Sequence, residues 1–326
     1  MDFFLNLLGI AAGIAILVWS ADIFVDGSVA FARRCGMSPL LIGMVIIGFG
    51  TSAPEMLVSV MAAIEHNPSI ALGNAYGSNI ANIGLILGLT AALAPITVQR
   101  SVVWREVPLL LFATAVAGAF LWRGGVISRT DAVAMLAIFL AIMVFNGVFG
   151  RGQQSEADGA TARPVSLGRA IAMILAGLAL LVGSSRLLVF CATNVARILG
   201  VPDLIIGLTI VAIGTSLPEL ASSIAAIRKH EHDLVIGNIV GSNLFNTLAV
   251  VGLACVISPM TAGAEKDAVL TIMRRDFPVV LAMTVFLWLT CIPWKRGCGA
   301  VIHRYEGLFL LFCFVAYMAW LVRDAL

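Results

Sequence analysis

Long apolar runs dominate this sequence and limit what the chain can fold into. Hydrophobic residues make up 60% of its 326 residues and charged residues 12%, whereas a soluble domain of this size is about one quarter charged. Alternating segments of about ten residues, the mark of a membrane β-barrel, do not occur. We therefore predict an all-α integral membrane protein with ten transmembrane helices. The predicted spans cover residues 4–30, 39–64, 70–95, 106–122, 131–149, 168–196, 203–227, 234–257, 277–293 and 305–322.

The distribution of Lys and Arg indicates the orientation of these spans. With the N-terminus outside, the inner loops hold twelve basic residues and the outer loops seven, so the positive-inside rule favours both termini outside. We interpret the first apolar run as a retained span, because it lacks a basic leader and exceeds signal-peptide length. We expect a multi-pass protein of the cell (inner) membrane whose partner is the lipid bilayer. The net charge of +2 argues against nucleic-acid binding, and no obligate protein partner is implied.

The two halves of the chain match each other at an offset of 164 residues. Residues 50–82 share 14 identities with residues 214–246 without a gap, mostly Gly, Pro, Ser, Thr, Asn and Glu. We predict two five-helix repeats, residues 1–149 and 167–326, joined by a cytoplasmic linker at 150–166. Because five is odd, the second repeat enters the membrane from the opposite face, and such inverted repeats are typical of secondary transporters.

Two glutamates, Glu55 and Glu219, lie at matching positions inside apolar spans. A carboxylate at membrane depth is costly, so it indicates a functional site unless it makes a structural hydrogen bond to a neighbouring helix. A proline precedes each glutamate, and it has no N–H to donate to the carbonyl four residues earlier. The carbonyl is then free to line an ion path, although a proline that only kinks the helix would leave the same pattern. These two carbonyls belong to Gly50 and Gly214.

Further polar side chains recur at helical spacing around the two glutamates. Thr51, Glu55 and Ser59 share one helix face, as do Thr215, Glu219 and Ser223. Two ladders step by four residues along the next span of each half, although a structural polar zipper would show the same spacing. The ladders are Asn74, Ser78, Asn82 and Asn238, Ser242, Asn246. Carboxylate, hydroxyl and amide oxygens without His or Cys suit hard cations such as Ca²⁺ or Na⁺.

The paired GTSxPE and GNxxGSNxxN strings resemble the alpha repeats of the sodium/calcium exchanger family, within the calcium/cation antiporter superfamily. The compact chain with its short linker is similar to prokaryotic members. The resemblance implies a ten-helix fold with ions bound between the second, third, seventh and eighth helices. It implies ligand roles for Thr51, Ser52, Glu55, Ser78, Asn82, Thr215, Ser216, Glu219, Ser242 and Asn246.

We therefore predict a secondary antiporter that exchanges Ca²⁺ for Na⁺ by alternating access. It is not an enzyme and needs no cofactor, because Ca²⁺ and Na⁺ are its transported ligands. Asn246 stands where some family members carry Asp, so coupling to H⁺ or K⁺ remains an alternative. A cation channel is a weaker one, and a membrane hydrolase would need metal-binding His or paired Asp residues that the spans lack.

Two charged motifs outside this cluster also carry predictions. Asp22 and Asp26 could line an ion entry path, but we interpret them as marking a helix end near the inner interface, beside Arg33 and Arg34. A basic residue, an acidic residue and an early proline predict a helix start. This pattern occurs at residues 105–108 and 275–278.

Overall fold

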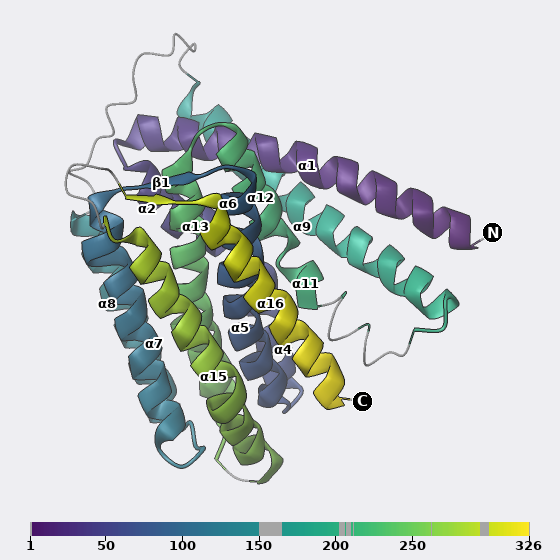
Figure 1. The fold of residues 1–326 in the computed structure, drawn as a ribbon, viewed down its shortest axis with the longest axis vertical. Coiled ribbons are helices and arrows are strands. Elements are labelled where there is room, and N and C mark those ends of the chain that lie inside the picture. Colours follow the sequence, from purple (N-terminus) through teal and green to yellow (C-terminus); the bar gives the residue numbers. More distant parts are fainter. Residues whose placement is uncertain are drawn as a thin grey trace.

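The computed structural model describes residues 2–149, 165–201, 206, 210, 212–261, 263–293 and 300–325. Residues 150–164, and with them most of the predicted linker, lie outside these ranges, as does most of the start of the span predicted at 203–227. The described residues form long helices, short π-helical segments (η) and two short strands (Figure 1). The prediction of a mostly helical membrane protein is confirmed.

In the first half the elements are α1 (Asp2–Cys35), α2 (Pro39–Ile42), η1 (Gly43–Ile47), α3 (Gly48–Thr51), α4 (Ala53–Ile64), α5 (Pro68–Ala81), η2 (Asn82–Leu87), α6 (Gly88–Leu93), β1 (Ile96–Val98), η3 (Val102–Glu106), α7 (Val107–Trp122) and α8 (Arg129–Phe149). In the second half they are α9 (Leu167–Ile198), α11 (Ala212–Thr215), α12 (Leu217–Arg228), α13 (His232–Leu244), η6 (Phe245–Val250), α14 (Val251–Ile257), α15 (Gly263–Cys291), β2 (Ala300–Ile302) and α16 (Arg304–Ala325). By length and hydropathy, seven helices among the described residues can cross a membrane, or eight if one bent pair is counted as a span.

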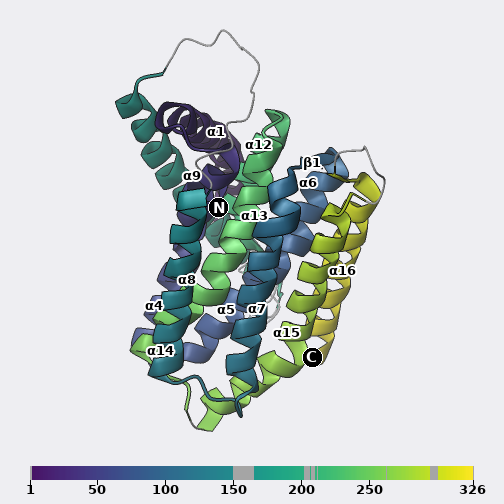
Figure 2. The same ribbon diagram turned by 90° about the vertical axis from the view of Figure 1, so that its left-hand side faces the viewer.

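The helices form a bundle with a buried centre and a peripheral pair. The stretch from α13 to α14 is the centre, with 89% of its most apolar window buried, against 33% for α1 and 28% for α9. Figures 1 and 2 show α1 and α9 running side by side at the edge of the bundle. Glycine permits their close contact, since a Cβ on Gly177 would lie 2.8 Å from Phe24 Cα.

The matching motifs of the two halves adopt the same local backbone. The helical stretch Pro39–Thr51, which ends with α3, is bent by 45° against α4 at Ser52. The pair α11–α12 breaks at Ser216 with nearly the same dihedral angles (φ −82°, ψ 1° at Ser52 and φ −91°, ψ 6° at Ser216). After α4 and α12 the chain turns at His66 and His230, which have φ of 57° and 59°. The sequence repeat is therefore also a repeat of helix breaks and turns.

Positions related by the 164-residue offset lie at opposite ends of the bundle. Ile96 pairs with Ile302 in the antiparallel β1–β2 ribbon, while Met260, the counterpart of Ile96, pairs with Ile127 in an isolated bridge. The ribbon lies at one end of the bundle, and the α7–α8 and α14–α15 connections that carry the bridge lie at the other (Figure 2).

One predicted helix boundary is wrong. The motif at residues 275–278 does not start a helix, because α15 begins at Gly263 and keeps Pro278 in its interior. Asp276 is tolerated there, since Arg275 Nε donates to its carboxylate at 2.7 Å and Tyr317 Oη donates to it at 2.7 Å. The acidic residue is thus a paired buried group rather than a first-turn residue.

Candidate cation site

The two glutamates predicted from the repeat are both buried at helix breaks. Glu55 lies in the first turn of α4 and Glu219 in the first turn of α12, each 1% exposed. A carboxylate in the first turn of a helix is favoured by the positive end of the helix dipole. Glu219 Oε1 lies 3.2 Å from Ser52 Oγ, three residues before Glu55, so the fold brings the acidic turn of each half to a common place.

Side chains of one half bond directly to those of the other at this place. Ser52 Oγ, at the break before α4, donates to Glu219 Oε1 at 3.2 Å. Thr51 Oγ1 lies 2.8 Å from Ile47 O and 3.3 Å from Asn238 Oδ1. Two residues of the GTSxPE string therefore contact the motif residues of the opposite half.

The first residue of each ladder holds the main chain of a glutamate. Asn74 Nδ2 donates to Glu55 O at 3.2 Å, and Asn238 Nδ2 donates to Glu219 O at the same distance. Both amides also contact a serine on the same helix as the glutamate, Ser59 at 3.2 Å and Ser223 at 2.9 Å. Asn74 and Asn238 thus act as positioning residues that fix the turn carrying each carboxylate.

The later ladder residues continue the polar core. Ser242 Oγ lies 3.4 Å from both Gly48 O and Asn238 Oδ1, and Ser78 is 5% exposed. Asn82 begins the π-helical segment η2 and Asn246 lies in η6. A π-turn widens the helix and shifts its side chains, and such turns often occur at functional sites.

Several buried oxygens of this cluster have no hydrogen-bond partner among the described residues. They are Glu55 Oε1 and Oε2, Asn79 Oδ1, Asn82 Oδ1, Ser216 Oγ, Glu219 Oε2 and Asn246 Oδ1. Buried polar atoms are ordinarily paired, so a gathering of orphaned oxygens around two carboxylates is a donor set suited to a dehydrated hard cation. Within the described ranges, no three His, Cys, Asp or Glu side chains lie close enough together to hold a metal ion by themselves.

The predicted main-chain ligands differ between the halves. The carbonyl of Gly214 accepts a hydrogen bond from Ser185 Oγ at 2.8 Å, so the prediction that it is unpaired is wrong. Proline removed one donor, and a serine from α9 replaced it. A Cβ on Gly50 would lie 3.1 Å from Leu178, so this glycine serves close packing against α9. Thr215 ends α11, directly before the break at Ser216.

The sequence analysis did not identify a second layer of buried amide side chains next to the ladders. Asn79 Nδ2 donates to Thr247 Oγ1 at 2.8 Å, and Asn82 Nδ2 lies 3.4 Å from Asn243 Oδ1. All four residues are at most 2% exposed. The identity of Asn79 and Asn243 across the repeat was the signal that could have revealed them.

Comparison with known proteins decides the family. A family model described as sodium/calcium exchanger protein matches residues 5–148 and 169–323. The chain belongs to the sodium/calcium exchanger family. Members of this family are transporters, so this exchanger is a membrane antiporter of cations and not an enzyme.

Relatives and solved structures cover nearly the whole exchanger. Inner membrane protein YrbG of Escherichia coli (strain K12) is 37% identical, over 95% of this chain and 94% of YrbG. Sodium/calcium exchanger MaX1 of Methanosarcina acetivorans is 28% identical, over 96% of this chain and 97% of MaX1. A structure of the sodium-calcium exchanger NCX_Mj superposes with a TM-score of 0.82 at 28% identity, over 97% of this chain and 99% of that one.

Proposed function

We propose that this exchanger transports Ca²⁺ in exchange for Na⁺ at a single site shared by its two halves. The observation that carries the proposal is the pair of buried glutamates, Glu55 and Glu219, joined across the halves by the Ser52–Glu219 hydrogen bond. Two carboxylates balance one Ca²⁺ or two Na⁺, and competition for the same oxygens makes the two cations alternate. MaX1 and NCX_Mj, which share the fold or sequence, bear the name of sodium/calcium exchangers.

The ligands that we assign to this site come from four broken helices. Glu55 and Glu219 supply the charge, and neutral oxygens complete the coordination shell. The neutral donors are Gly50, Thr51, Ser52, Ser78, Asn82, Gly214, Thr215, Ser216, Ser242 and Asn246. For Gly214, the bond from Ser185 leaves one carbonyl lone pair for an ion.

Alternating access requires a fold with two related arrangements, and an inverted repeat provides it. We propose ten transmembrane helices in two antiparallel repeats, residues 1–149 and 167–326. Ile96 and Met260 occupy matching positions of the two repeats. Ile96 pairs with Ile302 at one end of the bundle and Met260 with Ile127 at the other, which supports this topology. The distribution of basic residues supports an orientation with both termini outside and the linker at 150–166 inside.

Transport in proteoliposomes tests the site. An outward-directed Na⁺ gradient should drive ⁴⁵Ca²⁺ uptake by the wild-type exchanger. Glu55→Gln and Glu219→Gln should each reduce uptake to background, because one charge cannot balance Ca²⁺ in a dehydrated site. Glu65→Gln, at an exposed residue just after α4, is the matched control and should transport normally. Full transport by both site variants would refute the assignment.

The coupling ion is tested separately. Replacing internal Na⁺ by choline at a fixed pH gradient should abolish uptake, and adding K⁺ should leave it unchanged. Uptake that persists in choline and follows the pH gradient would establish Ca²⁺/H⁺ exchange instead. A dependence on K⁺ would establish the potassium-coupled mode.

A further inference from the structure

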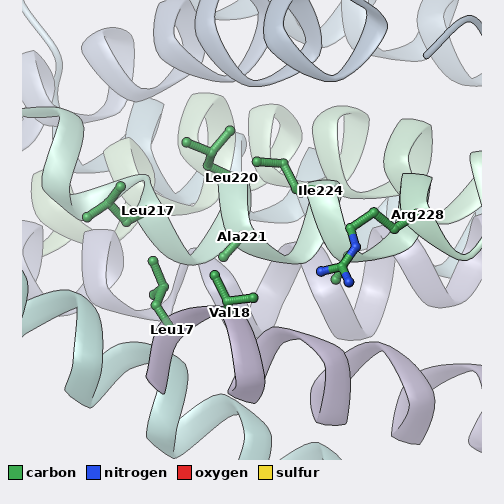
Figure 3. A pocket seen from close by; sticks show the side chains of 8 residues that line it. Leu17, Val18, Leu217, Leu220, Ala221, Ile224 and Arg228 are labelled. Atoms are coloured by element: carbon green, nitrogen blue, oxygen red, sulfur yellow. The ribbon is translucent and has the colours of Figure 1, made fainter. Parts of the chain in front are cut away.

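An apolar groove lies between α1 and α12, on the side of α12 away from Glu219. It measures about 100 Å³ and is lined by Leu17, Val18, Leu217, Leu220, Ala221, Ile224, Ala225 and Arg228. Figure 3 shows Leu17 and Val18 of α1 facing the α12 side chains, with Arg228 at one end. Among the described residues that line it, Arg228 carries the only charged side chain.

The α12 side of the groove is a continuous helical stripe. Leu217, Leu220, Ile224 and Arg228 follow at steps of three or four residues and so share one face. At 1.5 Å per residue, the eleven steps from Leu217 to Arg228 span about 16 Å. This is close to half of the hydrocarbon thickness of about 30 Å. The groove therefore has about the length of one leaflet.

The surrounding surface is of the kind that faces lipid. Ile14, Val18 and Trp19 on α1 are 49%, 46% and 59% exposed, and apolar side chains this exposed on a membrane-spanning helix contact acyl chains. An apolar groove that opens on such a surface is accessible to hydrocarbon from the bilayer.

The charges at the membrane end leave Arg228 available to an anion. Lys229 Nζ lies 2.7 Å from Asp26 Oδ1 and 3.7 Å from Asp22 Oδ1, so it already pairs with the two aspartates of α1 nearest to it. Arg228 Nη1 approaches Asp22 only to 3.9 Å, and its side chain is 60% exposed. A phosphate offers a guanidinium two strong hydrogen bonds that this loose ion pair does not.

The stripe is specific to the second half of the molecule. At the 164-residue offset, Arg228 corresponds to Ile64, which is 55% exposed at the end of α4. Ala221 corresponds to Leu57. The first half therefore presents an apolar surface without a cation at its end, and it supplies matched control positions.

We propose that this groove binds one anionic phospholipid, with part of an acyl chain lying in the groove along α1 and α12 and its phosphate on Arg228. Because α12 carries Glu219 on another face, the lipid occupies the joint between the peripheral helix pair and the helix that holds the cation site. The proposal is independent of which ion drives transport, since it concerns lipid binding alone.

Native mass spectrometry of the delipidated exchanger tests the proposal with phosphatidylglycerol and phosphatidylcholine of identical acyl chains. The first phosphatidylglycerol should bind about tenfold more tightly than phosphatidylcholine, as expected for one charge-assisted contact. Arg228→Gln should abolish this preference and Arg228→Lys should retain part of it. Arg304→Gln, at an exposed basic residue at the start of α16, should leave it unchanged.

The apolar part of the groove is tested without changing charge. Ala221→Phe should fill it and weaken the binding of the first phosphatidylglycerol about tenfold, whereas Leu57→Phe at the repeat-related position should not. These two variants decide the matter if Arg228→Gln does not fold. Equal affinities of the wild type for both lipids, unchanged phosphatidylglycerol binding in Ala221→Phe, or displacement of the lipid by inorganic phosphate alone would overturn the proposal.

Discussion

In α13, Asn238 contacts five partners, the main chain of Glu219 and the side chains of Thr51, Ser222, Ser223 and Ser242. In α5, its counterpart Asn74 contacts two, the main chain of Glu55 and Ser59, both in its own half. The same residue at the same repeat position is thus a junction between the halves in one case and a local support in the other. Identical motifs in the two halves therefore make different numbers of contacts.

The packing of the two helices explains this difference. α13 lies directly on the backbone of η1 and α3, because Gly237, Gly241, Gly43 and Gly48 remove the side chains between them. For Gly73 and Gly77 of α5, no described atom lies within 4 Å of an added Cβ. Backbone contact lets short side chains such as Thr51 and Ser242 reach across the interface.

The largest effect is expected where this packing is tightest. Gly241→Ala would place a Cβ 2.5 Å from Met44 O, and such a backbone clash should lower the stability of the exchanger by about 3 kcal/mol or more. Gly77→Ala should be neutral or slightly stabilising, because alanine is the better helix former by about 1 kcal/mol. Thermal unfolding in detergent, followed by fluorescence, measures both. Equal tolerance of the two substitutions would show that α13 is not the more tightly packed helix.

A smaller difference is expected between the two positioning amides. Asn238→Ala leaves several buried polar groups without a partner, and each such group costs about 1–3 kcal/mol. The Ca²⁺ concentration that gives half-maximal ⁴⁵Ca²⁺ uptake should therefore rise about a hundredfold. In Asn74→Ala it should rise about tenfold or less. The transport assay in proteoliposomes compares the two at equal protein density.

The contrast between these amides has a clear negative outcome. If Asn74→Ala and Asn238→Ala are equally impaired, the contacts of Asn238 to the other half contribute nothing to the site. A loss in Asn238→Ala that reflects unfolding would appear as a lower melting temperature. Thr51→Val, which removes the hydroxyl that contacts both Ile47 O and Asn238, would then test the cross-half contribution with Asn238 itself intact.

Much of this architecture could be predicted from the sequence. The apolar runs predicted the helices, and the paired glutamates could be located because a charge at membrane depth is too costly to be accidental. The breaks at Ser52 and Ser216 follow from the prolines two residues later. These features are local, and their periodicity and chemical types are visible in the sequence.

Features that depend on neighbouring helices could not be predicted. The hydrogen bond from Ser185 to Gly214 O joins residues 29 positions apart on different helices. No local sequence pattern predicts such a contact. The start of α15 was misplaced because Tyr317, 41 residues away, pairs with Asp276 and makes a buried acid tolerable within the helix. The π-turns at Asn82 and Asn246 have no recognised sequence signature, although they shift the ladder residues.

The smallest expected difference lies in the second layer of amides. Asn79 donates to Thr247, but the counterpart of Thr247 in the first half is Ile83, so Asn243 Nδ2 has no partner among the described residues. Thr247→Val should lower the stability by about 1–2 kcal/mol, because it leaves the Asn79 amide unpaired at nearly constant volume. Ile83→Thr should lower it less than the control Ile83→Val, which costs about 1 kcal/mol for the lost methylene. This order follows if the new hydroxyl pairs with Asn243, and thermal unfolding measures it. A larger loss of stability in Ile83→Thr than in Ile83→Val would show that the new hydroxyl does not pair with Asn243. The difference between the halves would then lie in the backbone and not in this one side chain.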